Sequence, residues 1–159
     1  MTGARGMKMK VAVGSDHAGY RFKEEIKALL QGMGIEYKDC GCMTEDSCDY
    51  PDIAAPVARA VACGEADRGI LVCGTGIGMS IAANKVRGIR ASLCHDVFSA
   101  KMTREHNNSN ILTIGARVID KELAFEIVKT WLASEYEGGR HARRLAKISL
   151  LETPMDEEE

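Results

Sequence analysis

Cys73 is the residue of this chain best placed to do chemistry. It ends the apolar run GILV and precedes three glycines at alternate positions within GILVCGTGIGMSIAANK (residues 69–85): Gly74, Gly76 and Gly78. The small residues that follow predict a helix directly after the glycines. A helix start offers backbone N–H groups to an anion, either a phosphate or an oxyanion formed during a reaction. A thiolate at such a position acts as a nucleophile or a base.

The glycine spacing argues against a nucleotide site. The loop reads GxGxG, not the GxGxxG of dinucleotide-binding folds, because position 79 is Met, and no lysine followed by serine or threonine completes a P-loop. Cys73 and Thr75 each also have a structural explanation. A small apolar residue ending a buried strand would also explain Cys73, and a hydroxyl capping the helix would explain Thr75.

Further side chains suited to chemistry stand elsewhere in the chain: Asp16, His17, His106, Asn107, Arg117, Arg140 and Arg144. An imidazole titrates near neutral pH and suits proton transfer, and arginines four residues apart share a helix face that suits a phosphate. Each group also has an ordinary structural explanation. Asp16 and His17 would cap a helix, His106 would face a helix dipole, and the arginines would form a solvated basic face.

The elements that must position these residues alternate along the chain. Strands are expected at the runs KMKVAVG, IEYKD, GILVC, IRASLC and ILTIGA, with amphipathic helices between them and one more helix at GGRHARRLAKISLLE. Continuous apolar strands separated by helices predict an α/β fold: an open five-stranded parallel sheet with helices on both faces, a Rossmann-like three-layer sandwich. Ligands bind at the carboxyl ends of such strands, so a site is expected at the loops SDHAG, CGTGIG and CHD.

Composition sets the class of the protein. The 159 residues are 45% hydrophobic and 28% charged, as in an ordinary globular domain, and the formal net charge of −2 gives no reason to expect nucleic acid or an anionic membrane as a partner. No apolar run of about 18 residues predicts a membrane span. We expect a cytoplasmic protein with one domain over residues 8–152, a disordered extension at 1–7 and an acidic tail at 153–159.

The six cysteines are interpreted for a reducing compartment, which disfavours a disulfide framework. Cys40, Cys42 and Cys48 come closest to the spacing of metal ligands. No CxxC pair and no nearby histidine accompany them, so a zinc site is disfavoured. Cys63 and Cys94 have apolar neighbours in the sequence and are expected in the core.

Six ordered segments together resemble the type B ribose-5-phosphate isomerases, in the family that also contains galactose-6-phosphate and allose-6-phosphate isomerases. The segments that carry the resemblance are GSDHAG (14–19), DYPD (49–52), GILVCGTGIGMSIAANK (69–85), REHNNSN (104–110), IGAR (114–117) and YEGGRHARR (136–144). The resemblance as a whole runs over residues 8–152. The resemblance implies interconversion of an aldose phosphate and a ketose phosphate, with no metal and no organic cofactor.

The resemblance also implies roles for single residues. Cys73 corresponds to the general base that moves a proton between C1 and C2 through an enediolate, and Thr75 to a residue that moves protons between the oxygens. The backbone N–H groups from Gly74 through Gly78, that of Ile77 included, correspond to the anion hole. His106 corresponds to the group that opens the furanose ring, assisted by Asp16. Other matched positions bind the substrate or close the pocket: Asn107 for the sugar, His17, Arg117, Arg140 and Arg144 for the phosphate, and Asp49 and Tyr50 for closure.

In the family the site is shared between two subunits, so the resemblance implies a homodimer, with a tetramer as an alternative. One branch of the family uses a glutamate base at the position of Met79, which leaves Cys73 as the base here. The alternatives are an isomerase of a six-carbon sugar phosphate, a non-catalytic module that binds a phosphorylated ligand, and a redox sensor acting through Cys73. The redox reading is disfavoured because Cys73 has no resolving cysteine at CxxC spacing.

Overall fold

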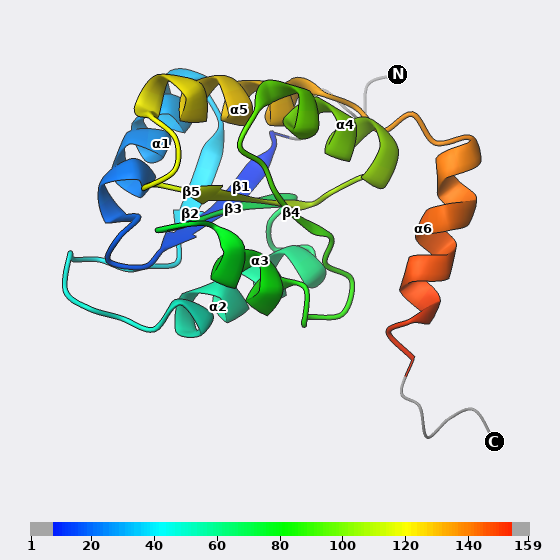
Figure 1. Ribbon diagram of the computed structural model, residues 1–159, viewed down its shortest axis with the longest axis horizontal. Coiled ribbons are helices and arrows are strands. Elements are labelled where there is room, and N and C mark those ends of the chain that lie inside the picture. The colour runs from blue at the N-terminus through cyan, green and yellow to red at the C-terminus, as the bar shows by residue number, and fades with distance from the viewer. Residues whose placement is uncertain (1–7, 154–159) are drawn as a thin grey trace.

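The structure, a computed structural model, describes residues 8–153 (Figure 1). The expected disordered extension at 1–7 and residues 154–159 of the expected acidic tail lie outside the described residues. The elements in chain order are β1 (Lys10–Ser15), α1 (Tyr20–Gly32), β2 (Glu36–Asp39), α2 (Tyr50–Ala62), β3 (Arg68–Cys73), α3 (Ile77–Ala83), β4 (Ala91–Leu93), α4 (Val97–Asn107), β5 (Ile111–Gly115), α5 (Lys121–Ala133) and α6 (Arg140–Leu150).

The five strands form one parallel sheet in the order β2-β1-β3-β5-β4. Strands β1 and β3 are buried from their second residue to their last, and every residue of β5 is buried. Burial along a whole strand requires cover on both faces, which explains why these strands read as continuous apolar runs. The predicted α/β fold is confirmed, and each of the five predicted strands is present.

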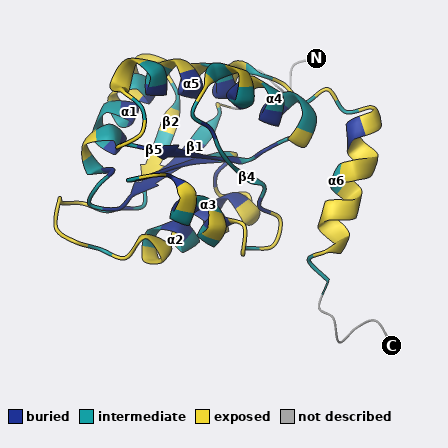
Figure 2. Ribbon diagram, viewed as in Figure 1, coloured by how far each residue is buried: buried dark blue, intermediate teal, exposed yellow. Residues whose placement is uncertain are grey.

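Helices cover both faces of the sheet (Figure 1). Helices α1, α4 and α5 lie on one face, where Ile26, Ile127 and Trp131 belong to the larger core cluster. Helices α2 and α3 lie on the other face, where Val57 and Met79 belong to a second cluster. The strands between the two clusters are the most deeply buried part of the chain (Figure 2).

The chain leaves adjacent strands β1 and β3 toward opposite faces of the sheet. Helix α1 follows β1 on one face and α3 follows β3 on the other, so the two loops part at the carboxyl ends of these strands. Such a switch point is where open α/β sheets bind ligands. The loops SDHAG and CGTGIG, which the sequence predicts to border a site, lie at this point.

Helix α6 is present as predicted but stands apart from the sandwich (Figure 1). His141 is its one buried residue within the described chain, and the rest of the helix is largely exposed (Figure 2). Leu150 and the neighbouring Leu151 are 70% and 82% exposed. A helix with so little cover within its own chain is not stabilised by the core of that chain.

The two cysteines expected in the core, Cys63 and Cys94, differ in burial. Cys94 is buried, and its burial raises the pKa of its thiol to about 12. The expectation for Cys63 is wrong: this residue is exposed because it is the C-cap of α2, where the chain turns away from the sheet. None of the helices described over residues 8–153 has the length and the apolar composition needed to cross a membrane.

Candidate functional site

Cys73 is the last residue of β3 and lies at the carboxyl edge of the sheet. The residue is 5% exposed, and its Sγ accepts a hydrogen bond of 3.1 Å from the backbone N–H of Gly76. A donor directed at sulfur stabilises negative charge on it. A cysteine with such a contact at the end of a strand is suited to act as a base or nucleophile.

The turn that directs this N–H depends on glycine at position 76. Gly76 has φ of 78°, in the left-handed region, and a Cβ here would lie 2.6 Å from Leu93 Cδ1. Backbone conformation and lack of space therefore both exclude a side chain. Gly115 meets a related limit, because a Cβ there would lie 2.6 Å from the carbonyl oxygen of Thr75. The loops after β3 and β5 thus touch through their backbones.

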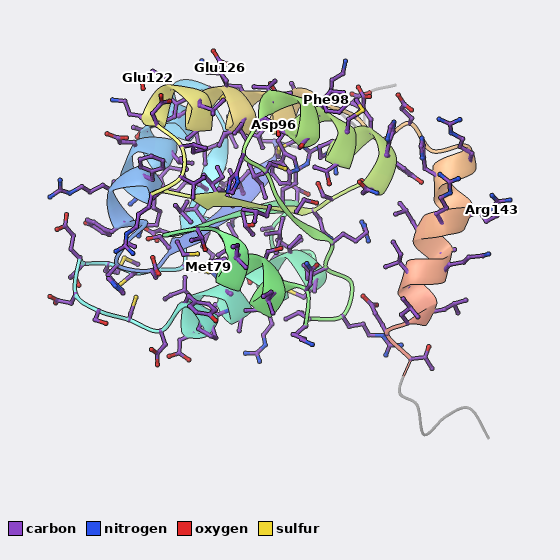
Figure 3. The ribbon with its side chains drawn as sticks, viewed as in Figure 1. Met79, Asp96, Phe98, Glu122, Glu126 and Arg143 are labelled. Carbon is purple, nitrogen blue, oxygen red and sulfur yellow. The ribbon has the colours of Figure 1, made fainter. Side chains whose placement is uncertain are left out.

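The loop after Cys73 also presents N–H groups. The N–H of Ile77 donates to Thr75 Oγ1 at 3.2 Å, and the N–H groups of Gly78 and Met79 belong to the first turn of α3, which has no intrahelical acceptor for them. Met79 itself is fully buried: its side chain packs in the core cluster formed with α2, and Figure 3 shows it on α3. The backbone of this turn can therefore bind an anion.

Asp16 and His17 follow β1 and lie beside Cys73. The N–H of Asp16 donates to the carbonyl of Val72 at 3.1 Å, and Asp16 Oδ1 accepts the N–H of Gly19 at 3.0 Å. His17 Nδ1 accepts the N–H of Cys48 at 3.4 Å. A neutral imidazole that accepts at Nδ1 carries its proton at Nε2, so His17 retains a donor for a ligand.

Arg117 and Tyr50 complete the group at this edge. The N–H of Arg117 donates to the carbonyl of Gly74 at 3.0 Å, and a Cβ at Gly74 would lie 3.4 Å from Nη1 of Arg117, so the guanidinium lies over the glycine loop. The Tyr50 ring lies against Gly78, where a Cβ would come within 2.7 Å of the ring. We call Asp16, His17, Tyr50, Cys73, Thr75 and Arg117 the carboxyl-edge group.

His95 is a neighbour of this group to which the sequence assigns no role. Its Nε2 lies 3.4 Å from the carbonyl oxygen of Thr75. The signal for it was its place in CHD, one of the three loops expected at the carboxyl ends of the strands.

A buried lysine holds the loop beside Asp16. Lys23 on α1 is 1% exposed, and its Nζ donates to both carboxylate oxygens of Asp39 at 2.9 Å and to the carbonyl of Cys42. Burial opposes ionisation of Asp39, but Lys27, the N–H of Gly41 and Lys23 together keep the pKa of this carboxyl below its usual value. The ion pair fixes residues 41–42, whose backbone pairs with Ser15 just before Asp16.

His106 and Asn107 lie at the other edge of the sheet. They end α4, which runs from the carboxyl end of β4 to the amino end of β5. Arg90, which precedes β4, donates from Nε to the carbonyl of Asn107 at 3.1 Å and so places this helix end at the amino edge. Within one chain, His106 is therefore separated from Cys73 by the length of the strands.

Glu137, just before α6, and His141, in its first turn, are two residues that the sequence did not single out. The ring of His141 stacks on His106, with centroids 4.3 Å apart and 19° between the planes. Glu137 Oε2 lies 3.9 Å from Nε2 of His106 and 3.6 Å from Nε2 of His141. The available signal was the i,i+4 spacing of Glu137 and His141. We call His106, Asn107, Glu137, Arg140, His141 and Arg144 the helix-end group.

Arg140 and Arg144 are both exposed on α6, apart from the sandwich. Figure 3 shows that α6 lies apart from the glycine loop: Met79 is on α3 in the body of the molecule, and Arg143 is on the separate helix. Arg143 lies between Arg140 and Arg144 in the sequence. The residues expected to grip a phosphate are thus divided, with His17 and Arg117 at the carboxyl edge and Arg140 and Arg144 on α6.

His106, Glu137 and His141 also have donor atoms suited to a metal. In residues 8–153 they are the one group of three histidine, cysteine or acidic ligands whose donor atoms all lie within 4.8 Å of one another. The stacked rings direct their nitrogens side by side and not toward a common point, which is poor geometry for one ion. The cysteines at 40, 42 and 48 form no such group in the part of the chain described here.

A surface cavity of about 470 Å³ lies away from both groups, at the amino ends of β1 and β2. Its lining residues are Lys8, Gln31, Gly34, Ile35, Glu36 and Tyr37. Its lining contains no histidine and no cysteine, and it shares no residue with either group of candidate site residues.

Comparison with known proteins shows the family of the chain. The family model described as Ribose/Galactose Isomerase matches residues 11–148. The chain belongs to the ribose/galactose isomerase family. Within the family it is 50% identical over 143 residues to ribose-5-phosphate isomerase B of Escherichia coli (strain K12), an alignment that covers 90% of this chain and 96% of the relative.

Two further members of the ribose/galactose isomerase family extend the comparison. The structure of ribose-5-phosphate isomerase B from Clostridium thermocellum matches with a TM-score of 0.90 at 53% identity, over 91% of this chain and 97% of that chain. D-erythrulose-4-phosphate isomerase of Pectobacterium atrosepticum is 46% identical over 145 residues, covering 91% of this chain and 95% of the relative. The resemblance stated from the sequence motifs is therefore confirmed, and the fold is that of the family.

This member of the ribose/galactose isomerase family brings only part of its expected site together within one chain. Asp16, Cys73, Thr75 and Arg117 meet at the carboxyl edge, with Tyr50 on the glycine loop and His17 on the neighbouring loop. His106 and Asn107, together with the arginines of α6, form the second group at the other edge.

Proposed function

We propose that the protein interconverts ribose 5-phosphate and ribulose 5-phosphate, as an aldose–ketose isomerase. The observation that carries the proposal is the hydrogen bond from the Gly76 N–H to Cys73 Sγ, at a strand end beside unpaired N–H groups of a helix start. A base beside an anion site is what proton abstraction next to a carbonyl requires, because the oxyanion must be stabilised as it forms. The relatives named ribose-5-phosphate isomerase B support the choice of substrate.

In the proposed reaction Cys73, as the thiolate, removes a proton from C2 of the open-chain aldose and returns it to C1. The electrons of the broken C–H bond form the C1–C2 double bond of an enediolate, and the N–H groups from Gly74 through Gly78 stabilise its negative oxygen. Thr75, whose hydroxyl accepts from the Ile77 N–H at the same turn, moves protons between the two oxygens.

The phosphate is bound at the far end of the substrate. His17 offers Nε2–H, and the Arg117 guanidinium lies over Gly74. Arginine binds phosphate through two parallel N–H donors, so Arg140 and Arg144 extend the grip from α6. Asp49 and Tyr50 close the pocket, since the Tyr50 ring already lies against Gly78 of the loop.

Ring opening precedes proton abstraction for a furanose substrate. We assign it to His106, with Asp16 assisting and Asn107 contacting the sugar, because an imidazole exchanges protons near neutral pH. One chain holds His106 and Cys73 at opposite edges of its sheet. The assignment therefore requires a homodimer in which His106 of the partner subunit, with the arginines of its α6, reaches the carboxyl-edge group; a tetramer would be built from such dimers.

The exposed α6 supports this assembly. The helix leaves its own sandwich, carries the two arginines and exposes Leu150 and Leu151, as an arm that packs on a second subunit would. Apolar surface of this kind gains most of its stabilisation when a partner covers it. We further propose that the enzyme works in the cytoplasm, where a reducing environment disfavours permanent disulfides among its six free cysteines.

A substrate panel tests the proposal. Purified protein is offered ribose 5-phosphate, allose 6-phosphate, galactose 6-phosphate and D-erythrulose 4-phosphate, and the isomeric product is followed. The highest kcat/KM is expected with ribose 5-phosphate. The four-carbon substrate is the second candidate, because a relative 46% identical to this chain carries the name D-erythrulose-4-phosphate isomerase. Preference for any other sugar phosphate reassigns the substrate within the family, and binding without turnover indicates a non-catalytic module.

A further inference from the structure

The loop between β2 and α2 carries three cysteines to which the proposed reaction gives no task. Cys42 is anchored at the base of this loop: its N–H donates to the carbonyl of Ser15 at 2.7 Å, and its carbonyl accepts from Nζ of the buried Lys23. At the far end, the N–H of Cys48 donates to His17. Cys42 therefore lies at the anchored end of the loop, and Cys48 lies at the end that contacts the candidate site.

The loop folds back on itself between these ends. The hydroxyl of Thr44 accepts the N–H of Asp46 at 3.2 Å, which makes a tight turn, and Cys42 Sγ lies 3.9 Å from the carbonyl oxygen of Asp46. The turn brings the thiols of Cys42 and Cys48 close enough for each to shift the pKa of the other. Both residues are partly exposed, so a small reagent can reach them.

The two thiols differ in acidity in the manner of a reactive dithiol. The backbone N–H of Thr44 and then the Cys48 thiol, as hydrogen-bond donors, lower the pKa of Cys42. Burial and the hydrogen bond to Cys42 raise the pKa of Cys48 to about 11. Cys42 is thus the thiolate that attacks, and Cys48 holds the proton until its partner has reacted.

We propose that Cys42 and Cys48 are an oxidisable pair that closes into a disulfide within the loop 42–48. The Cys42 thiolate attacks one sulfur of a low-molecular-weight disulfide and releases its other half as a thiolate. Cys48 then loses its proton to solvent, attacks the Cys42 sulfur of the mixed disulfide and releases the second thiolate. Two protein thiols are oxidised to one disulfide, and one small disulfide is reduced to two thiols.

Other partners for these sulfurs fit less well. The Cys40 thiol, whose pKa burial raises, lies near the carbonyl of Lys38, at 4.0 Å. A metal would need a third ligand, and within residues 8–153 no histidine, cysteine or acidic group completes a cluster with Cys42 and Cys48. The disulfide is therefore the chemistry that the pair supports.

The disulfide changes the candidate site through His17. A covalent bond draws Cys48 toward the anchored Cys42, and the N–H of Cys48 is the donor that orients the His17 ring. Asp49 and Tyr50 follow directly in the chain. This part of the inference rests on the proposed function: with His17 displaced, a charge-assisted contact to the phosphate is lost, and KM for ribose 5-phosphate rises about tenfold.

Peptide mapping tests the disulfide without reference to activity. The full chain carrying Cys40→Ser and Cys63→Ser is treated with glutathione disulfide, its remaining thiols are blocked during denaturation, and the protein is cleaved after its glutamates. Cys42 then lies in the peptide 37–45, Cys48 in the peptide 46–65, and Cys73 and Cys94 in the peptide 66–105, so with Cys40 and Cys63 replaced only a bond between Cys42 and Cys48 joins the first two peptides. These two peptides are expected to stay joined until dithiothreitol is added. Separate peptides 37–45 and 46–65 at glutathione disulfide concentrations that oxidise other exposed dithiols overturn the proposal.

Kinetics in the same background test the link to the site. Oxidation is expected to raise KM about tenfold, reversibly with dithiothreitol, and a further Cys42→Ser substitution is expected to abolish the change. A rise in KM that persists with Cys42→Ser overturns the link, because it then arises elsewhere, for example at Cys73. If the peptides 37–45 and 46–65 are joined in a protein that does not turn over ribose 5-phosphate, the disulfide stands and the proposed function fails.

Discussion

The carboxyl-edge group and the helix-end group are built in opposite ways. Cys73 is held by a buried strand and by a loop in which Gly76 and Gly115 leave no free space. The helix-end group combines the last turn of α4 with a helix that has a single buried residue, His141. A proton transfer between adjacent carbons needs the first kind of construction, because small displacements of the base cost much of the rate. A group meant to contact a second subunit needs the other construction, because an exposed helix such as α6 extends beyond its own domain.

Replacing Cys73, the proposed base of the carboxyl-edge group, is expected to have the largest effect on activity. In Cys73→Ala, kcat for ribose 5-phosphate is expected to fall about 10⁴-fold, at the upper end of what a general base contributes, while sugar-phosphate binding is retained because the phosphate contacts lie elsewhere. Steady-state kinetics and calorimetric titration measure the two quantities. Cys94→Ala, at another buried cysteine after a strand, is the control and is expected to keep kcat. An active Cys73→Ala enzyme would contradict the role of the thiolate.

The rigidity of the carboxyl edge is tested through the buried ion pair. In Asp39→Asn the buried Lys23 loses its counter-charge, and the free energy of unfolding at pH 7 is expected to fall by about 3 kcal/mol. Urea denaturation measures this loss. The control is Glu36→Gln on the same strand, whose side chain is 61% exposed and whose ion pair with Lys10 contributes little.

The same pair predicts a pH dependence. The pKa of Asp39 is lower in the folded chain than in the unfolded chain, so the unfolded state binds the proton more readily. The stabilisation is complete above the unfolded pKa of about 4 and is lost as the pH falls through the folded value. Wild-type stability is therefore expected to drop more steeply below about pH 4 than that of Asp39→Asn. Parallel pH profiles of the two proteins would show that Asp39 gains no stabilisation from its charge.

His106→Asn tests the helix-end group. With furanose substrate, kcat is expected to fall about 10²-fold, because ring opening loses its proton-transfer group. With a substrate that cannot close to a ring, such as D-erythrulose 4-phosphate, the loss is expected to be small if the enzyme accepts it. Rates measured on both substrates decide the point. Equal losses would assign His106 a structural role and not ring opening.

Mixing the two inactive variants tests whether the groups act across subunits. Cys73→Ala and His106→Asn subunits are denatured together and refolded. Half of the random dimers then contain one site with both residues intact, so about a quarter of wild-type activity is expected to return. Mixing two preparations of Cys73→Ala is the control. No recovery, although size measurement shows mixed dimers, would place both residues in the same chain's site.

Much of the fold was predictable because its signals are local. The apolar runs gave all five strands, and the rule for carboxyl ends brought Asp16, Cys73 and Arg117 to one edge. Less local features were not predictable. Lys23 looks like a surface residue of an amphipathic helix, and its burial depends on Asp39, 16 residues later. The stacking of His106 on His141 depends on the direction of α6, which no apolar pattern specifies.

The direction of α6 is set by two glycines with positive φ. Gly138 and Gly139, between α5 and α6, have φ of 66° and 57°, and Gly139 combines its value with ψ of −129°, a conformation in which only glycine is at ease. Neither glycine has an atom within 4 Å of where a Cβ would stand, so space imposes no limit there. A single methyl group at Gly139 would therefore change the direction of α6, and with it the positions of Arg140 and Arg144, without touching the core.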